Sequence, residues 1–423
     1  MSKLDELIKR YCPNGVEYKA LGEMGEFFGG ITGKSKADFV DGNAKFVTYR
    51  NIYSNPALNL EIKERVRIGA DESQRTLEYG DILFTGSSET PDECGISSVI
   101  TQKVTEKLYL NSFCFFLRLN DPNVLLPDFS KHLFRSDELR RQIGKTASGV
   151  TRFNVSKKLM AKVLVPVPPL PVQREIVRIL DDFSELSAEL SAELSARKKQ
   201  YEYYRDQLLS FNNVRGGLAF VKPESVRWMT LGEIGTFERG RRFVHADDRD
   251  EGIPCIHYGE LYTHYGIWAD KVKTHINPDI TTKLRYAEKG DVVIVAAGEN
   301  NTDIGVGVAW LGNEKVAVHD ACFIFRHKQN PKYISYLLRT KGYHQEIKKY
   351  VSEGKICSIS AEGLAKAKFP VPPIEIQDRI VQVLDNFDSI CSDLRIGLPA
   401  EIDARKKQYE FYRDKLLTFK KAV

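Results

Sequence analysis

The sequence predicts an α+β fold with a pseudo-twofold internal repeat, in which two similar mixed α/β globular domains are joined by two long antiparallel coiled-coil helices. The first observation is a duplication: residues 196–209 return as residues 404–417, with 12 of 14 positions identical at a separation of 208 residues. The second is a proline-rich run that stands before each copy. The third is the stretch of roughly 150 residues before each run, which is long enough to bury its own core.

The 423-residue chain accordingly divides into four segments. Matches outside the helices support a pairing of the globular parts, because residues 16–27 resemble residues 226–237 and Gly80-Asp resembles Gly290-Asp. The predicted segments are a first globular domain over 1–165, a central helix over 166–211, a second globular domain over 212–369 and a C-terminal helix over 370–423.

Each globular part mixes strand and helix patterns. Short apolar runs bounded by Gly, Asn and Asp predict strands, and they lie at 81–84, 113–119, 291–296 and 322–325. Apolar residues at helical spacing predict helices over 127–146 and 331–350. These patterns predict mixed α/β domains but do not give the order of their strands.

The prolines predict where each long helix begins. In Pro166-Val-Pro-Pro-Leu-Pro the chain is held extended, and Pro171 can occupy the first helical turn, where its missing N–H costs nothing. The second copy repeats this arrangement at 370–373. Gly397 and Pro399 then predict a break or kink in the second helix before Ala400.

One face of the central helix carries a nearly continuous coiled-coil stripe. Its positions are spaced by three or four residues, with one stutter, and they are Ile179, Phe183, Leu186, Leu190, Leu194, Arg197, Tyr201, Tyr204, Leu208 and Phe211. The stutter lies in a tandem Ser-Ala-Glu-Leu repeat at 187–194, and four residues add about 6 Å and return nearly to the same face. Packing of the two helices on each other is favoured, and a coiled coil between two chains is the alternative.

Composition limits the class of protein. No stretch approaches 18 consecutive apolar residues, and the N-terminus has no apolar core of a signal peptide, so we expect a cytoplasmic protein without a membrane span. Seven scattered cysteines without a CxxC pair predict reduced thiols. Catalytic and metal motifs such as HExxH and GxSxG are missing, which predicts no catalytic residues and no metal ligands in this chain.

Charge favours contact with a polyanion. The chain carries a net +5, and because segments 173–211 and 375–419 together carry −4, the remainder carries +9, as 5 + 4. Gly29-Gly-Ile-Thr-Gly-Lys-Ser resembles a phosphate loop, but its first glycine is displaced and the second copy lacks it. A Gly-rich loop that brings cations to phosphates is the preferred interpretation, with Lys34, Lys36, Arg239, Arg241 and Arg242 as the candidates.

Polar loops at equivalent places in both halves are candidates for contacts to base edges. The sequence pairs Tyr49-Arg50-Asn51 with His257-Tyr258-Gly259, 87–90 with 297–301, and 149–154 with 354–358. The scaffold repeats while these side chains differ, as expected if each half reads a different short sequence. The candidates are Tyr49, Arg50, Asn51, Ser87, Ser88, Arg152, Asn154, His257, Tyr258, Asn300, Asn301 and Lys355.

The doubled Pro-Val-Pro-Pro signature, with Gln173 and Gln377 after it, the helices and the Ser-Ala-Glu-Leu tandem resemble the specificity subunit of Type I restriction–modification systems. The resemblance covers nearly the whole chain. It implies two target-recognition domains that each bind one half of a split, asymmetric site on double-stranded DNA, with the helices as a spacer. It also implies a non-catalytic chain without a cofactor of its own.

The resemblance further implies that the helices dock two methyltransferase subunits, which bring S-adenosylmethionine, and that restriction subunits bring ATP- and Mg-dependent translocation. The residues of the spacer and docking helices would be Leu186, Leu190, Leu194, Tyr201, Tyr204, Leu208, Tyr409, Tyr412 and Leu416. Two alternatives remain open. One is a structural coiled-coil adaptor without sequence-specific DNA binding, and the other is a nucleotide-binding enzyme that uses the Gly-Lys-Ser loop.

Overall fold

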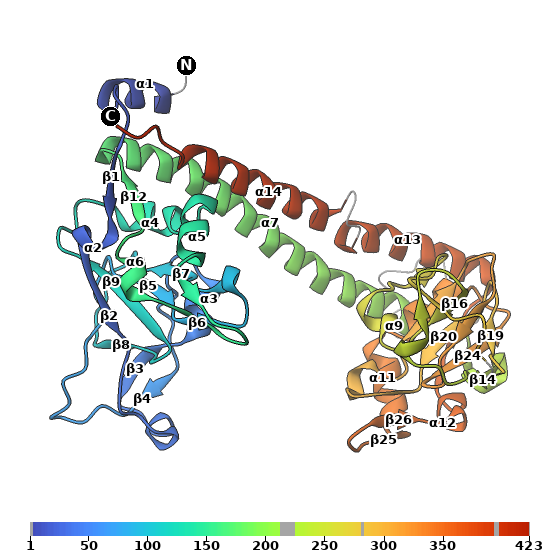
Figure 1. Cartoon of the computed structure of the whole chain (residues 1–423). Coiled ribbons are helices and arrows are strands. Elements are labelled where there is room, and N and C mark those ends of the chain that lie inside the picture. The colour runs from blue at the N-terminus through green and yellow to red at the C-terminus, as the bar shows by residue number, and fades with distance from the viewer. Residues whose placement is uncertain (1–2, 212–224, 281–282, 393–396, 423) are drawn as a thin grey trace. The chain divides into compact units, whose positions relative to one another are not determined.

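The computed structural model describes residues 3–211, 225–280, 283–392 and 397–422. The chain forms two compact units (Figure 1). The first unit comprises Met1–Ser191 and Glu401–Val423, and the second comprises Ala192–Ala400. Each unit therefore combines one globular domain with parts of the long helices. None of the described helices is long and apolar enough to cross a membrane.

The first unit has a four-stranded antiparallel sheet at its centre, because its apolar runs are buried on both faces. Its strands, in spatial order, are β2 (Gly25–Gly29), β9 (Cys114–Leu119), β5 (Ile82–Thr85) and β7 (Ser97–Val99). A three-stranded sheet contains β4 (Arg65–Val66), β3 (Ala44–Val47) and β8 (Leu108–Leu110). A second three-stranded sheet contains β10 (Ala147–Ser148), β11 (Phe153–Val155) and β6 (Ser87–Ser88), and β1 (Glu17–Ala20) pairs with β12 (Leu164–Val167).

Short helices cover these sheets. They are α1 (Lys3–Tyr11), α2 (Leu21–Met24), α3 (Tyr49–Ser54), α4 (Pro127–Leu133), α5 (Asp137–Gly144) and α6 (Lys157–Met160), with 3₁₀ turns at η1 (Lys36–Phe39) and η2 (Pro91–Glu93). Local sequence explains their starts. Pro127 occupies the first turn of α4, and the hydroxyl of Thr48 accepts a hydrogen bond from Asn51 N at the start of α3.

The second unit repeats this plan with more strands in its two main sheets. One contains β14 (Gly235–Arg239), β24 (Cys322–His327), β20 (Val292–Val295), β22 (Gly307–Trp310) and β17 (Trp268–Ala269). The next contains β15 (Asp248–Arg249), β18 (Thr274–Ile276), β16 (Ile253–Ile256), β23 (Val316–Val318) and β19 (Tyr286–Ala287). The smallest contains β21 (Ala297–Gly298), β26 (Cys357–Ile359) and β25 (Val351–Ser352), and β13 (Arg227–Thr230) pairs with β27 (Lys368–Val371).

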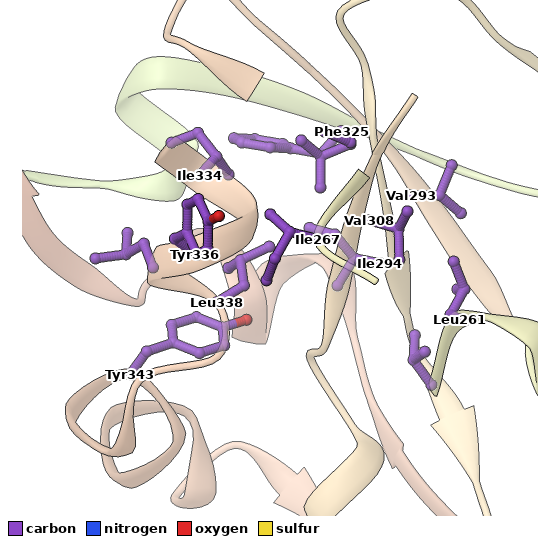
Figure 2. Packing of buried hydrophobic residues seen from close by; sticks show 14 of the residues in the cluster. Leu261, Ile267, Val293, Ile294, Val308, Phe325, Ile334, Tyr336, Leu338 and Tyr343 are labelled. Atoms are coloured by element: carbon purple, nitrogen blue, oxygen red, sulfur yellow. The ribbon is translucent and has the colours of Figure 1, made fainter. Parts of the chain in front are cut away.

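The core of the second unit lies between its first sheet and two of its helices, α10 (Pro331–Leu337) and α11 (Lys341–Lys348). The other helices of this domain are α8 (Leu231–Ile234), α9 (Glu260–Thr263) and α12 (Ala361–Ala365), with 3₁₀ turns at η4 (His245–Asp247) and η5 (Asn301–Asp303). Figure 2 shows Ile294 and Val308 of the sheet facing Tyr336 and Leu338. All four residues are buried, so this domain has an apolar core of its own.

The predicted long helices are present, and the second is divided. Helix α7 runs without interruption over Leu170–Ser210. Its counterpart consists of α13 (Ile374–Ser392) and α14 (Leu398–Leu416), with Pro399 in the first turn of α14. The predicted break before Ala400 is confirmed, since α14 begins only at Leu398; residues 393–396 lie outside the described residues.

The helices pack antiparallel, as predicted (Figure 1). In the first unit, Phe183 of α7 stacks on Tyr412 of α14 with ring centroids 5.3 Å apart. In the second unit, Tyr204, further along α7, stacks on Phe387 of α13, which precedes α14, at 6.0 Å.

Each copy of the repeated segment packs on the globular domain of the other copy. In the first unit, Tyr409 of α14 lies 2.8 Å from His132 Nδ1, and Asp414 accepts a hydrogen bond of 2.9 Å from Asp137 N at the start of α5. In the second unit, Asp206 of α7 accepts the corresponding bond from Lys341 N at 3.4 Å. The two copies of Arg-Asp thus cap equivalent helices.

His132 joins three helices of the first unit. Its Nε2 lies 2.7 Å from Asp181 on α7, and its Nδ1 faces the Tyr409 hydroxyl. Burial lowers the pKa of His132 below its ordinary value, although the hydrogen bond to Asp181 acts in the opposite direction. The ring is therefore neutral at pH 7, with Nε2–H donating to Asp181 and Nδ1 accepting from Tyr409.

A fully buried glutamine anchors the start of each long helix. Gln173 accepts a hydrogen bond from Leu126 N at 2.8 Å and donates to the carbonyls of Val124 and Pro168 at 2.9 and 2.7 Å. Gln377 accepts from Asn330 N at 3.0 Å in the same way. These bonds satisfy backbone groups that burial removes from water, which explains why glutamine follows the prolines in both copies.

Replacement of Gln173 by leucine is expected to lower the free energy of unfolding of the first unit by about 3 kcal/mol, because three backbone groups, one in a buried and two in partly buried hydrogen bonds, lose their partners. Urea unfolding followed by circular dichroism measures the change. The matched control is Gln207→Leu on the exposed side of the same helix, for which we expect little effect. Equal effects of the two substitutions would contradict the anchoring role.

Candidate nucleic-acid interface

A cavity of about 580 Å³ in the first unit brings together side chains from distant parts of the sequence. It lies where the start of α3, strand β6 and the β10–β11 hairpin meet. Five of the predicted residues line it, namely Tyr49, Arg50, Ser87, Ser88 and Arg152, together with Tyr53, Glu89, Glu93, Phe113 and Thr151. The structure therefore brings these five positions together around one cavity.

Hydrogen bonds organise the floor of this cavity. The Tyr49 hydroxyl donates to the Ser87 carbonyl at 2.9 Å, and Arg152 Nε and Nη2 lie 3.1 and 3.0 Å from Ser87 Oγ. Burial raises the pKa of Tyr49, although hydrogen bonds to side chains act in the opposite direction, so its hydroxyl stays protonated. The Arg152 guanidinium also lies 5.8 Å from the centre of the Phe113 ring. The cavity offers an oriented cation beside exposed aromatic surface.

The hairpin between β10 and β11 projects beside this cavity. Val150 at its tip is 92% exposed and Phe113 is 61% exposed. Asn154 on β11 is also exposed and faces Ser87 in the strand pairing. An exposed tip next to a lined hollow is a shape that can enter a groove or cover a base edge.

Two predicted contacts of the first unit have structural partners instead. The amide of Asn51 donates to the Asn59 carbonyl at 2.8 Å and accepts from Asn59 N at 3.2 Å, which ties α3 to the following loop. The ammonium group of Lys34 is paired with Glu72. Neither side chain is available as a simple loop-tip donor, whereas Arg50 and Lys36 are exposed.

The phosphate-loop interpretation of residues 29–35 does not fit the local geometry. The loop leads from β2 into the four-residue 3₁₀ turn η1, not into an α-helix whose N-terminus could hold a phosphate. Ser35 donates to Asp38 at 2.8 Å, and Lys34 is held by Glu72. The arrangement lacks the elements by which a phosphate loop holds a nucleotide.

The structure corrects the pairing of Tyr49 with His257 by one residue. Strand β3 pairs with β8 as β16 pairs with β23, and Ala44 in β3 takes the place of Ile253 in β16. Tyr49 therefore corresponds to Tyr258, and Thr48 to His257. The Tyr49–Tyr53 pair, with centroids 6.2 Å apart, recurs as Tyr258–Tyr262 at 6.4 Å.

The strand register decides which residues correspond within the paired segments 149–154 and 354–358. Ala147 faces Val155 as Val351 faces Ile359, so Asn154 corresponds to Ser358 and Arg152 to Ile356. Ile356 is 64% exposed. At β21 the residues Ala297 and Gly298 take the place of the serines of β6. The equivalent position in the second unit is thus less polar.

The other predicted residues of the second unit are spread over three loops. Arg241, Arg242 and Lys355 are exposed. Arg239 donates to the Asp320 carbonyl at 2.8 Å, Asn300 to Asp303 at 3.3 Å and Asn301 to Glu353 at 2.6 Å. His257 is buried and its Nε2 lies 2.9 Å from Asp248, so it does not sit at a loop tip.

Packing uses much of the predicted docking stripe. Tyr201 belongs to the core of the second unit, where Leu194 and Leu208 pack against it, and Tyr409 and Leu416 pack against the core of the first. Leu186 and Leu190 are half-buried, while Tyr204 and Tyr412 stack on aromatic rings as described above. The stripe residues thus pack inside each unit. Other faces of these helices remain available to a partner subunit.

Sequence reasoning missed one pair of exposed aromatic residues on those faces. Tyr203 on α7 is 60% exposed and Phe411 on α14 is 61% exposed. They occupy the same position of the duplicated segment, since 203 + 208 = 411. The signal was present in the repeat, where both copies place an aromatic residue outside the stripe.

Comparison with known proteins agrees with this organisation. The model of the Type I restriction modification DNA specificity domain matches the chain twice, over residues 13–197 and 223–404. The Escherichia coli EcoR124I/EcoR124II specificity subunit is 34% identical over 288 residues, which cover 63% of this chain and 65% of that subunit, slightly less than two thirds of its length. A putative type I specificity subunit of Mycoplasma pneumoniae is 31% identical over 254 residues, covering 60% of this chain and 92% of the relative.

A solved structure shares the fold at low sequence identity. It comes from work on complex assembly and conformational transition of the type I restriction–modification system. Its TM-score is 0.65 at 18% identity, and the match covers 96% of this chain and 98% of the other. From the two matched domains, which together span most of the sequence, it follows that the chain belongs to the Type I restriction–modification DNA specificity family.

Proposed function

We propose that this chain is the sequence-specific DNA-recognition subunit of a Type I restriction–modification complex, in which each unit reads one half of a bipartite asymmetric site. The cavity that gathers Tyr49, Arg50 and Arg152 is the observation that carries this proposal. Arginine can bind guanine O6 and N7 through two hydrogen bonds, and serine can bind either partner of a base pair. Glu89, which is exposed, can accept a hydrogen bond from a cytosine amino group.

Differences between the two units support an asymmetric target. Arg152 in the first unit corresponds to Ile356 in the second, and Thr48 corresponds to His257. A pair of identical reading surfaces would favour identical half-sites, whereas these surfaces present different donors and acceptors. The repeated scaffold with unlike side chains therefore favours two different half-sites.

We assign no catalytic step to this chain. The proposed partners are double-stranded DNA, two methyltransferase subunits that bring S-adenosylmethionine, and restriction subunits that bring ATP- and Mg-dependent translocation. The exposed Tyr203 and Phe411 are the proposed anchors for the two methyltransferase subunits. All seven cysteines are unbridged and buried, which supports action in the reducing cytoplasm.

Substitution of Arg152 by alanine is expected to relax recognition at one position of one half-site, at about 1–3 kcal/mol for a true base contact. The test uses the complete methyltransferase complex and maps methylated adenines by long-read sequencing. The loss of discrimination between base pairs at that position measures the contribution of the Arg152 contact.

The control is Lys63→Ala, an exposed cation of the same unit outside the cavity. It is expected to weaken binding equally for all sequences, if at all, and to leave the methylated motif unchanged. An unaltered motif for Arg152→Ala, with methylation activity retained, would refute the assignment of this cavity.

A further inference from the structure

Two histidines and an aspartate of the second unit form a compact cluster. His245 Nδ1 lies 2.9 Å from one carboxylate oxygen of Asp248, and His257 Nε2 lies 2.9 Å from the other. One ligand atom from each of the three residues lies within 4.8 Å of the other two. The imidazole rings stack with centroids 4.4 Å apart. Three potential metal ligands thus converge although 12 residues separate the first from the last.

The fold fixes two of the three ligands. Asp248 lies on β15 and His257 follows β16, and both strands pair with β18, where Asp248 and Ile253 face the same residue, Ile276. The His257 side chain is only 5% exposed, and its ring lies edge-on to Phe243 at 4.9 Å. The side chain of His245 on η4 is 81% exposed. The cluster is therefore buried at His257 and open to solvent at His245.

The described residues of the first unit contain no equivalent of this cluster. The pairing of β3 with β16 and of η1 with η4 places Lys36, Phe39 and Thr48 at the three positions. There Phe39 packs edge-on against Phe46 with centroids 5.2 Å apart. An apolar contact at this place suffices to build the same loop, so the scaffold itself does not require the polar cluster. A role specific to the second unit explains its presence better than a need of the fold.

The donor set is that of a zinc ion. Imidazole nitrogen and carboxylate oxygen bind Zn²⁺ at about 2.0–2.2 Å, so two donors on one tetrahedral ion lie about 3.3 Å apart. Asp248 lies 2.9 Å from each histidine through its two oxygens, and all three ligand atoms lie within 4.8 Å of one another, so side-chain rotations can bring the donors to this value. Imidazole is also the ligand by which proteins favour zinc over magnesium or calcium.

We propose that His245, Asp248 and His257 form a binding site for a divalent transition-metal ion, with Zn²⁺ as the preferred occupant and water at the fourth position. The ion joins η4 and β15 to the end of β16 and so holds in place the segment that carries Arg241 and Arg242. Its role is structural, since it orders an exposed, arginine-bearing loop. The proposal revises the expectation that this chain binds no metal, and it does not depend on the proposed DNA-recognition function.

Titration of the untagged full-length chain with Co²⁺ tests the site directly, because tetrahedral Co²⁺ with nitrogen and oxygen ligands absorbs visible light. We expect one equivalent to bind, Zn²⁺ to displace it, and Zn²⁺ to raise the thermal unfolding midpoint. Loss of one ligand in His245→Ala or Asp248→Asn is expected to weaken binding at least about tenfold. His245 is exposed, so its replacement tests the site without disturbing the core.

The matched control is His264→Ala, an exposed histidine of the same domain outside the cluster. It is expected to bind Co²⁺ as the unchanged chain does. The competing interpretation is a hydrogen-bonded His–Asp–His network without an ion. Absence of the visible band with the unchanged chain, or a band of equal affinity in His245→Ala and Asp248→Asn, would establish that interpretation and overturn the proposal.

Discussion

Deletion of residues 191–194 is expected to change the target to one with a spacer shorter by one or two base pairs, while both half-sites stay the same. These residues are one Ser-Ala-Glu-Leu unit inside the uninterrupted helix α7. Removing them shortens the helix by about 6 Å and turns its end by about 40°, and 6 Å corresponds to roughly two base pairs of 3.4 Å. Long-read mapping of methylated adenines in cells that carry the complex gives the spacer.

Because the deleted residues are one unit of a repeat, the deletion leaves the sequence pattern around it unchanged. Leu190 is followed by Ser195-Ala after the deletion, as it is followed by Ser191-Ala before it, so the half-buried seam keeps its pattern. Ser191→Ala is the control, because it removes the hydrogen bond of 2.8 Å to the Ser187 carbonyl without changing the length. A constant spacer in the deletion variant would show that α7 does not set the distance.

Loss of both Tyr203 and Phe411 is expected to release both methyltransferase subunits at concentrations at which the unchanged chain still binds two. Truncation of an aromatic anchor at an interface costs about 2 kcal/mol or more, so each alanine weakens its own subunit about thirtyfold or more. Both side chains are largely exposed, so the unfolding midpoint of the chain is expected to change little. Size-exclusion chromatography with light scattering counts the bound subunits.

The single variants sharpen this test. Tyr203→Ala or Phe411→Ala alone is expected to leave one methyltransferase subunit bound, because the two residues occupy equivalent places of the repeat. Tyr79→Ala is the control, since Tyr79 is 50% exposed and lies on the first globular domain. Recovery of a complex with two subunits from the double variant would exclude this helix face as the docking surface.

Most of the fold could be predicted from the internal sequence repeat. The helices, their antiparallel packing and the break near Gly397 could be predicted because near-identity, proline and glycine act locally. The packing of each repeated helix segment on the globular domain of the other copy could not be predicted. Residues 196–209 and 404–417 are so alike that either copy fits either domain. Three-dimensional contacts decide between the two arrangements, among them those of Tyr409 with His132 and of Asp206 with Lys341.

The candidate site was predicted in part. Tyr49, Ser87 and Arg152 could be identified because both halves place polar loops at the same points of the repeat. The pairing of His257 was wrong by one residue, since only the strand register distinguishes it from Thr48 or Tyr49 as a partner. The cluster of His245, Asp248 and His257 could not be predicted, because its side chains come from separate elements that are brought together by the pairing of β15 and β16 with β18.

The first unit includes segments from both ends of the chain. Val16 N donates to the Lys420 carbonyl at 2.8 Å, and Ala422 N donates to the Val16 carbonyl at 2.9 Å. Leu417 belongs to the same core as Leu4. During translation, the first globular domain is therefore complete only after residues 401–422 have been made. A nonsense mutation shortly before codon 401 would thus harm the N-terminal domain more than the C-terminal one.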